Sequence, residues 1–444
     1  MSGLTLGVST SAYQTEGAVD EDGRGVSIWD RFAHTPGKVP AGDHGDVACD
    51  HYHRWPQDLD IVRDLGVHAY RFSISWPRIF PTGFESKPNE PGLDFYERMV
   101  DGILERGIVP WVTLYHWDLP QPVQDVGGWA HRTSVSAFER LIDAVTRRLG
   151  DRVTHYNTIN EPWCAAILGY EAGQHAPGVT DRVQALQAAH HLLLAHGRAV
   201  PIVRANSPGA RVGMVVNPVQ AYAASPSPQD ADAVDRFHAW FNQWFIDPLA
   251  GRGYPERIVE EERAAGHWPG EGDPDWLLPG DLSTISVPCD FLGVNYYSRS
   301  IQRGPEEGNL PRVIEEPADD ARTDIGWEVY PDGLYDLVSQ LHRDYRFPSL
   351  AITECGAAYD TEPDADGRVR DARRVDYLST HIQAAERARE DGVPLEAFFV
   401  WSLLDNFEWN EGYARRFGIV HVDFDTQQRT LKDSALWLKN RLRS

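Results

Sequence analysis

The chain has 444 residues and an acidic charge balance, with 42 Lys and Arg against 66 Asp and Glu and a formal net charge of −24. A field of that sign repels phosphate backbones and anionic membrane surfaces, so the composition excludes a nucleic-acid-binding or membrane-surface protein. Because 42% of the residues are hydrophobic and 11% are aromatic, the chain can build a large core, and we expect it to be folded throughout.

The cysteines indicate reduced thiols. Cys49, Cys164, Cys289 and Cys355 form no CxxC pair, which argues against both a zinc site and a disulfide framework. The N-terminus has no basic stretch followed by an apolar run, and no apolar segment of the sequence reaches transmembrane length. We therefore predict a soluble, cytoplasmic protein.

One alternation of short apolar runs and amphipathic segments repeats along the chain. The apolar runs are rich in β-branched residues and predict strands at residues 4–9, 68–74, 108–115, 153–159, 211–217, 290–297, 350–354 and 396–404. Between them, apolar residues recur at helical spacing and predict helices at residues 58–66, 96–107, 134–150, 185–205 and 374–391.

These repeated strand and helix units predict an α/β fold, the (β/α)₈ TIM barrel. Right-handed crossovers between parallel strands close naturally into this barrel, whose chains extend beyond about 400 residues when the loops carry insertions. A doubly wound open sheet is the alternative, but no GxGxxG follows the first predicted strand. No linker or compositional break interrupts the chain, so we expect a single barrel domain over residues 1–444.

Barrel enzymes carry their chemistry at the C-terminal ends of the strands, and polar and aromatic residues gather there in this sequence. They are Gln14 and Glu16 after the first strand, Arg71 in the second, His116 and Trp117 after the third, Asn160 and Glu161 after the fourth, Asn217 after the fifth, Asn295 and Tyr297 at the sixth, Glu354 at the seventh and Trp401 at the eighth. Amides and carboxylates bind sugar hydroxyls, and an indole stacks on the apolar face of a pyranose. The set therefore predicts a carbohydrate site.

Two carboxylates in such a site are typical of glycosidic bond cleavage, in which one protonates the leaving oxygen and the other is the nucleophile or base. Glu161 and Glu354 are the candidate pair. We expect Arg71 to lie beside Glu354 and keep it ionised, and Tyr297 to donate its phenolic proton to Glu354. Glu161 has no cation near it in the sequence, so we interpret it as the acid.

Motifs spread over the whole chain resemble those of the family 1 glycoside hydrolases, which are retaining β-glucosidases of broad specificity. The motifs are RFSISWPRI (71–79), YHWDLPQ (115–121), TINEPW (158–163), GVNYYS (293–298), GWEVYPDGL (326–334), ITECG (352–356), WSLLDNFEW (401–409) and RRFGIVHVDF (415–424). Their number, order and spacing are far more specific than a single NEP or TE dipeptide. The resemblance implies an enzyme that needs no cofactor and no metal.

Carried over residue by residue, the resemblance implies that Glu161 is the acid/base and Glu354 the nucleophile, with Arg71, Asn295 and Tyr297 supporting the nucleophile. It also implies a substrate-binding set: Gln14 and Glu408 on the 3-, 4- and 6-hydroxyls, His116 and Trp409 on the 3-hydroxyl, Asn160 on the 2-hydroxyl, Trp401 as the stacking floor, Trp327 as the platform under the leaving group, and Trp117 and Phe417 beside them. A cis peptide bond between Trp401 and Ser402 is implied as well.

One position departs from the family motif. Cys355 follows Glu354 directly, where the family sequence TENG has Asn. The smaller, less polar side chain removes an amide that could bond nearby loops, which concerns the positioning of Glu354 and not its chemistry.

Two other histidine groups are interpreted as structural. The HxH pair in Asp50-His51-Tyr52-His53 leads into a predicted helix, and no further donors complete a metal site, so we predict none. His190 and His191 are expected on the solvent and packing faces of their helix. Cys164 is expected to form a pocket wall, because no neighbouring base or cation would activate its thiol.

The leading interpretation is an exo-acting β-glycosidase that removes a terminal β-glucosyl, galactosyl or fucosyl unit from a small glycoside or short oligosaccharide. A 6-phospho-β-glycosidase is disfavoured because Glu408 would repel the phosphate, and a thioglucosidase because Glu161 is not replaced by Gln. A catalytically inactive sugar-binding protein is the alternative from another class. The natural aglycone depends on loops at 165–182, 220–232 and 301–326, which carry no decisive signal, and the oligomeric state is equally open.

Overall fold

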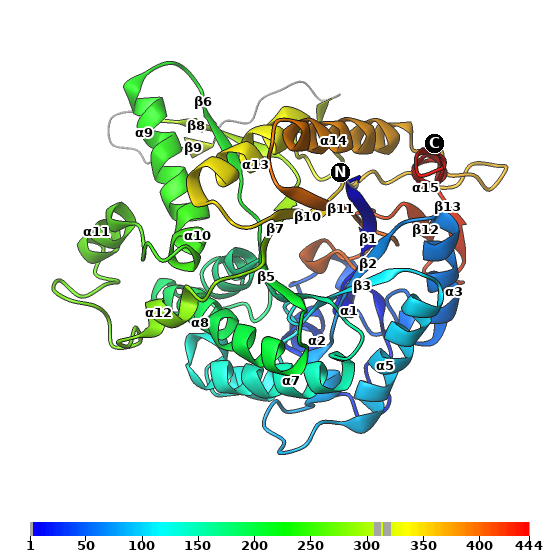
Figure 1. Ribbon diagram of the computed structural model, residues 1–444, viewed down its shortest axis with the longest axis horizontal. Helices are drawn as coiled ribbons and strands as arrows, with labels where there is room; N and C mark the ends of the chain where they lie inside the picture. The colour runs from blue at the N-terminus through cyan, green and yellow to red at the C-terminus, as the bar shows by residue number, and fades with distance from the viewer. Residues whose placement is uncertain (1–2, 306–311, 314–320, 444) are drawn as a thin grey trace.

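The computed structural model describes residues 3–305, 312–313 and 321–443 and centres on a closed barrel of parallel strands (Figure 1). Around the barrel the strands follow the order β1, β11, β10, β7, β5, β4, β3, β2. Their bounds are Thr5–Ser9 (β1), Ala69–Ser73 (β2), Val109–Thr113 (β3), His155–Asn160 (β4), Arg211–Val216 (β5), Phe291–Tyr296 (β7), Leu350–Cys355 (β10) and Leu395–Trp401 (β11). All eight coincide with predicted strands, so the barrel is confirmed and the open sheet was the wrong alternative.

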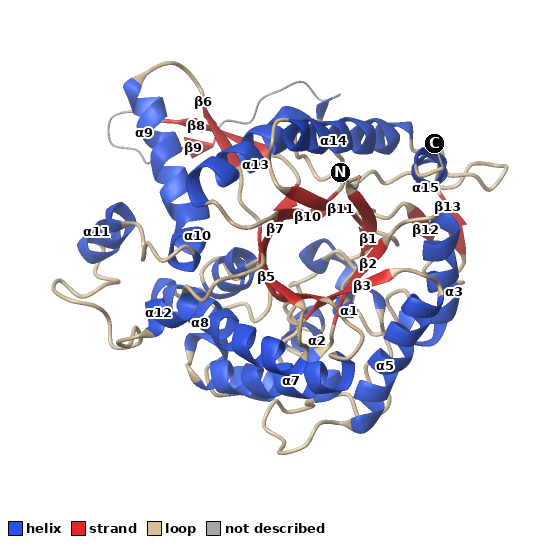
Figure 2. Ribbon diagram, viewed as in Figure 1, coloured by secondary structure: helices blue, strands red, loops and turns tan. Residues whose placement is uncertain are grey.

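Figure 2 shows helices arranged around the outside of this ring of strands. The main ones are α3 (His51–Leu65), α5 (Glu90–Glu105), α7 (Thr133–Leu149), α8 (Arg182–Asn206), α13 (Pro331–Tyr345), α14 (Ala372–Glu390) and α15 (Asp433–Arg441). Five of them were predicted, but α3 and α5 begin several residues earlier than expected. Polar residues and a proline lie near the start of each helix, Pro56 in α3 and Pro91 in α5, and periodicity alone does not assign such residues to a helix. In the described part of the chain, no helix is both long and apolar enough to cross a membrane.

Large aromatic side chains fill the interior of the barrel. The ring centroid of Trp111 lies 5.0 Å from that of Phe399 and 5.3 Å from that of Phe291. Glycines on the neighbouring strands make room for them, because a Cβ atom added at Gly7 would lie 2.5 Å from the Phe399 ring and one at Gly213 would lie 2.7 Å from the Phe291 ring. The barrel is therefore a packed core, and any open site must lie at its mouth.

The long loops carry structure of their own. A small sheet of β6 (Gln220–Ala223), β8 (Arg299–Arg303) and β9 (Arg312–Val313) lies beside α9 (Pro228–Phe237), at the upper left of Figure 1. A π-helical turn, η4 (His238–Gln243), continues α9 into α10 (Trp244–Leu249). Within the predicted loop 301–326, residues 306–311 and 314–320 lie outside the described part of the chain.

The expectation for His190 and His191 was wrong in one respect, because neither faces solvent. They are 0% and 2% exposed on α8. His190 Nε2 lies 3.0 Å from Asp281 Oδ2, at the start of α12 (Asp281–Ile285), and His191 Nδ1 lies 2.8 Å from the carbonyl oxygen of Trp129. The inserted α12 segment packs on this helix and covers the face that its polar side chains suggested was exposed.

Candidate active site

A cavity of about 700 Å³ opens at the carboxyl ends of the barrel strands. Most of the predicted site residues line it, namely His116, Trp117, Glu161, Asn295, Tyr297, Trp327, Glu354, Trp401, Glu408, Trp409 and Phe417. Gln14, Arg71 and Asn160 do not line the cavity. They lie directly behind it, and each is hydrogen-bonded to a lining residue.

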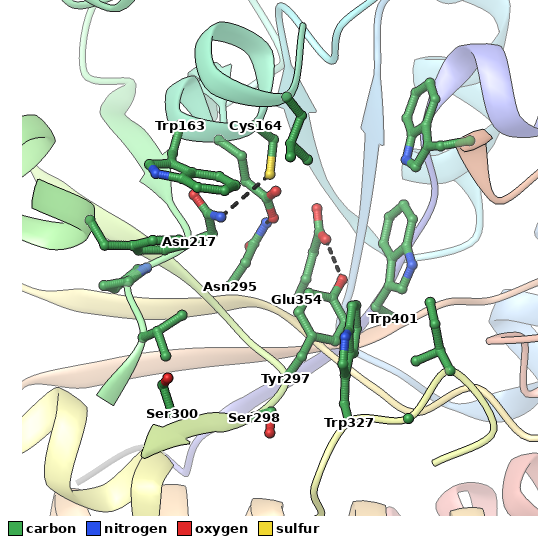
Figure 3. A pocket seen from close by; sticks show the side chains of 18 of the residues that line it. Trp163, Cys164, Asn217, Asn295, Tyr297, Ser298, Ser300, Trp327, Glu354 and Trp401 are labelled. Carbon is green, nitrogen blue, oxygen red and sulfur yellow. Dashed lines mark hydrogen bonds between the residues drawn. The ribbon is translucent and has the colours of Figure 1, made fainter. Parts of the chain in front are cut away.

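Both carboxylate oxygens of Glu354 are held by charge-assisted hydrogen bonds. Arg71 Nη1 donates to Oε1 at 2.7 Å and Tyr297 Oη donates to Oε2 at 2.6 Å, the contact that is dashed in Figure 3. The side chains of Arg71 and Glu354 are 0% and 4% exposed. The contacts with Arg71 and Tyr297 that the sequence predicted for Glu354 are therefore present, and they hold its carboxylate in one orientation.

Glu161 stands in the same cavity with a different set of neighbours. It follows β4 directly in a left-handed backbone conformation (φ 48°), and its amide donates to the carbonyl oxygen of Val215 on β5. Burial, together with the negative charge of Glu354, raises the pKa of the Glu161 carboxyl to about 7, against a smaller opposing effect of the Asn295 amide. A carboxyl with this pKa holds a proton near neutral pH, as a general acid must.

Asn295 contacts Glu161, and not Glu354 as expected. Its Nδ2 donates to Glu161 Oε1 at 2.5 Å and to Asn160 Oδ1 at 3.2 Å. Its Oδ1 accepts a hydrogen bond from Thr353 Oγ1 at 2.7 Å, which turns the amide nitrogen toward Glu161. The expected support of Glu354 by Asn295 is corrected accordingly: this amide orients Glu161, while Arg71 and Tyr297 hold Glu354.

Asn160 connects the two sides of the site. Its Oδ1 accepts from Arg71 Nη2 at 2.6 Å, and its Nδ2 lies 3.2 Å from His116 Nε2. Burial and the nearby Arg71 charge lower the pKa of His116 well below the usual value, so the imidazole is neutral and its Nε2 accepts from the amide. The backbone carbonyl of Asn160 accepts from Trp117 Nε1 at 2.9 Å.

A third carboxylate, Glu408, also lines the cavity. Gln14 Nε2 lies 3.4 Å from Glu408 Oε2 and also donates to the carbonyl oxygen of Phe407 at 2.9 Å. Burial, followed by the charges of Glu354 and Glu161, raises the pKa of Glu408 well above its usual value. A bound hydroxyl group that donates to Glu408 would offset this repulsion.

Aromatic rings form the floor and the rim. The ring planes of Trp401 and Trp409 lie within 18° and 19° of that of His116, each at a centroid distance of 5.9 Å. The expected cis peptide bond joins Trp401 and Ser402. Trp327 is 38% exposed at the rim, 5.2 Å from the Tyr297 ring and 6.0 Å from that of Phe417.

The structure also places several residues that the sequence analysis did not single out. Trp163, Phe241 and Phe237 form a row of rings that lines the cavity, with centroid distances of 4.2 Å and 5.2 Å between successive rings. Phe241 and Phe237 belong to the insertion after β5, and no motif marked them. Cys164 lines the cavity as expected, and Asn217 Nδ2 lies 3.4 Å from its Sγ (Figure 3).

The environment of Cys355 explains how the chain accommodates this residue. Its side chain is fully buried, and Sγ lies 3.6 Å from the hydroxyl of Tyr377 on α14. The same hydroxyl donates to the backbone carbonyl of Tyr297 at 3.1 Å. The residue after Glu354 therefore contacts the scaffold that holds Tyr297, and no local signal in the sequence pointed to Tyr377.

The HxH pair does not converge on one point. His51 is buried in α3 with Nδ1 2.8 Å from Asp58 Oδ2, and Asp58 also accepts from Arg429. His53 contacts Asp50 and Glu21 at the surface. The two rings therefore serve separate ion-pair networks.

The barrel, the paired carboxylates and the surrounding indoles together define an enzyme that acts on carbohydrate. Residues 2–444 match the family model described as glycosyl hydrolase family 1. The chain is 45% identical to beta-glucosidase A of Acetivibrio thermocellus and 43% identical to the bifunctional beta-D-glucosidase/beta-D-fucosidase of Bifidobacterium breve, covering 98% of this chain and 96% of each relative. The solved family 1 β-glucosidase of Thermotoga maritima superposes with a TM-score of 0.95 at 44% identity, covering 100% of this chain and 97% of that one.

The chain therefore belongs to glycosyl hydrolase family 1. The resemblance inferred from its motifs is confirmed over nearly the full length.

Replacing Tyr297 by Phe removes one of the charge-assisted bonds to Glu354 and leaves the ring in place. Such a bond contributes about 1.5–3 kcal/mol, so we expect kcat/KM on a β-glycoside to fall by about 10- to 150-fold. Steady-state kinetics with a chromogenic glycoside measures the loss.

Tyr296→Phe is the matched control. The hydroxyl of this neighbouring residue donates to the carbonyl oxygen of Tyr330 at 2.6 Å and not to Glu354. The control should stay within about threefold of the unmodified enzyme. Equal losses in the two variants would contradict a specific role for Tyr297.

Proposed function

We propose that this protein is a retaining exo-β-glucosidase in which Glu354 is the nucleophile and Glu161 the acid/base. The observation that supports this assignment is the contrast between the two carboxylates. Glu354 is held by Arg71 and Tyr297, whereas Glu161 has a pKa raised to about 7. Two carboxyl groups in one site with opposite environments are the arrangement that double displacement requires.

In the first step, Glu354 attacks the anomeric carbon while Glu161 gives its proton to the glycosidic oxygen. The aglycone leaves as a neutral alcohol, and a glycosyl ester forms on Glu354. In the second step, Glu161, now a carboxylate, takes a proton from water, and the water oxygen displaces Glu354. Each residue returns to its starting protonation state, and the sugar retains its configuration.

The glycone is assigned to the inner end of the cavity. Glu408 and His116 lie there for hydroxyl groups, and Trp401 offers a ring face for the pyranose. Gln14 lies behind Glu408, and its Nε2 donates to the carbonyl oxygen of Phe407 and to Glu408 Oε2. We therefore assign to Gln14 the orientation of Glu408 as well as the predicted sugar contact. Trp327 and Phe417 are assigned to the outer end, beneath the leaving group.

The preferred substrate is proposed to be a small β-glucoside or short oligosaccharide, with β-fucosides and β-galactosides as further substrates. Relatives named as a β-glucosidase and as a bifunctional glucosidase and fucosidase support the glucoside and fucoside part of this range. The four cysteine thiols are all buried and unpaired, which fits a cytoplasmic location. We also propose that the whole chain acts as one barrel domain, without a nucleic-acid partner.

A panel of 4-nitrophenyl β-glycosides with gluco, galacto and fuco configuration tests this function. We expect hydrolysis of the glucoside, and proton NMR should detect the β anomer of the released sugar first. The inactive control is Glu354→Gln. Release of the α anomer first would refute retention, and the absence of turnover on every glycoside would favour a non-catalytic sugar-binding protein.

The rate should depend on pH through Glu161. As an acid it must be protonated, so kcat/KM should fall as the pH rises through about 7. Glu161→Ala removes this basic limb and should slow substrates with poor leaving groups far more than a dinitrophenyl glucoside. The pH profiles of the two enzymes test this role, and equal losses on both substrates would exclude Glu161 as the proton donor.

Replacing Glu408 by Ser tests the glycone contact. The change removes a buried carboxyl acceptor and leaves sugar hydroxyls unpaired, which should weaken transition-state binding by about 1.5–3 kcal/mol and lower kcat/KM on the glucoside by about 10- to 150-fold. Glu260→Ser, at an exposed position of α11 (Glu256–Ala264), is the control. A loss below about twofold would show that Glu408 does not contact the sugar.

A further inference from the structure

Three metal-ligand side chains converge in the segment that follows α2 (Ile28–Ala33). They are His34, which caps the end of that helix, and His44 and Asp46 in the loop before α3. Across residues 3–305, 312–313 and 321–443, this is the one group of three such residues whose ligand atoms all lie within 4.8 Å of one another. We propose that His34, His44 and Asp46 form a binding site for a divalent transition-metal ion, outside the catalytic cavity.

The spacing of the ligand atoms suits a small coordination shell. His34 Nε2 lies 3.2 Å from Asp46 Oδ2, and His44 Nδ1 lies 3.2 Å from Asp46 Oδ1. Adjacent ligands of a tetrahedral zinc ion with bonds of 2.0–2.1 Å are about 3.3 Å apart. The two imidazole rings are stacked, with centroids 4.6 Å apart and planes at 19°, so the His44 ring must turn about its Cβ–Cγ bond to bring both lone pairs onto one ion.

Two of the ligand atoms have no hydrogen-bond partner among the described residues. His44 Nδ1 and Asp46 Oδ1 are shielded from solvent, and neither makes a hydrogen bond within the described part of the chain. They face each other at 3.2 Å without the geometry of a hydrogen bond, an arrangement that native proteins seldom leave uncompensated. An ion bound by both atoms satisfies them at once.

The third ligand is already oriented. His34 Nδ1 lies 2.7 Å from the carbonyl oxygen of Asp30 and donates to it as an N–H, so Nε2, which lies 3.2 Å from Asp46 Oδ2, is the nitrogen that a metal ion would take in place of a proton. A hydrogen bond from one ring nitrogen to a carbonyl is the usual support of a metal-bound histidine.

The ligand types select the ion. Two imidazoles and one carboxylate favour Zn²⁺, Cu²⁺ or Ni²⁺ over Mg²⁺ and Ca²⁺, which prefer oxygen ligands. The side chains of His34, His44 and Asp46 are 49%, 43% and 31% exposed, so water can complete the shell and the ion can exchange. The net charge of −24 raises the local concentration of cations.

The position of the site links it to the glycone side of the enzyme. Tyr413 donates its backbone N–H to Asp43 Oδ2 at 2.9 Å and its hydroxyl to the carbonyl oxygen of His44 at 2.9 Å. Tyr413 is the last residue of the segment 408–413, which begins with Glu408 and Trp409. A bound ion would therefore join the end of α2 to the loop 43–46, to which Tyr413 is hydrogen-bonded. Binding should stabilise the folded enzyme.

Zinc titration of the chelator-treated full chain tests the proposal. We expect one Zn²⁺ per chain by isothermal titration calorimetry, and a Tm that rises with Zn²⁺ concentration but not with Mg²⁺ concentration. His44→Ala and Asp46→Asn should each weaken binding by about tenfold or more, because each removes a ligand. Their side chains are partly exposed, so the variants should fold, which hydrolysis of a chromogenic glycoside verifies.

His131→Ala is the matched control, since this exposed histidine contacts Thr133 and belongs to no group of ligands. Zinc binding by this variant should equal that of the unmodified chain. An anomalous scattering peak between His34, His44 and Asp46 in zinc-soaked crystals would support the site directly. The proposal is overturned if zinc binding is absent, or if His44→Ala and Asp46→Asn bind zinc as the unmodified chain does. These outcomes do not depend on the proposed glycosidase activity.

Discussion

The guanidinium of Arg71 is fully buried, and a buried cation must be paired with its neighbours at short range. Arg71 extends from β2 and satisfies this requirement with Glu354 on β10 and Asn160 on β4. One side chain thereby sets the positions of the proposed nucleophile and of the amide that precedes the proposed acid. Leaving that charge without its partner is strongly unfavourable, so the carboxyl ends of these strands are held in one arrangement before any substrate binds.

The pairing of Arg71 with Glu354 also gives Glu354 and Glu161 different properties, although their side chains are chemically identical. Glu354 receives donors on both oxygens, and its negative charge then acts on Glu161, which accepts from the Asn295 amide and contacts no cation among the described residues. Burial and the negative charges of Glu354 and Glu161 also raise the pKa of Glu408. Three carboxyl groups in one cavity give a site that favours hydroxyl donors and disfavours anions, which fits a neutral sugar better than a phosphorylated one.

Behind these groups, the packing of the barrel supports the site. Aromatic rings fill the interior at Trp111, Phe291 and Phe399, so the strands are supported from within. At the mouth, Tyr377 on α14 holds the backbone of Tyr297 and contacts Cys355. The Asn that the family motif has after its nucleophile is thus replaced by a thiol that fills a closed space, and Tyr297 keeps its contact with Glu354.

Local patterns in the sequence were enough to predict the barrel, because apolar periodicity and β-branched runs follow from burial that each strand and helix experiences by itself. The position of a residue at a strand end likewise predicted Glu161, Glu354, Arg71 and Tyr297 as neighbours, since a closed parallel barrel brings all its strand ends to one mouth. Tertiary packing alone decided the rest. Thr353 turns the amide of Asn295 toward Glu161, and Asp281 at the start of α12 pairs with His190 of α8. The inserted α9 and η4 bring Phe237 and Phe241 to the cavity wall. Each of these arrangements depends on contacts between segments far apart in the chain, and such contacts leave no periodic signal in the sequence.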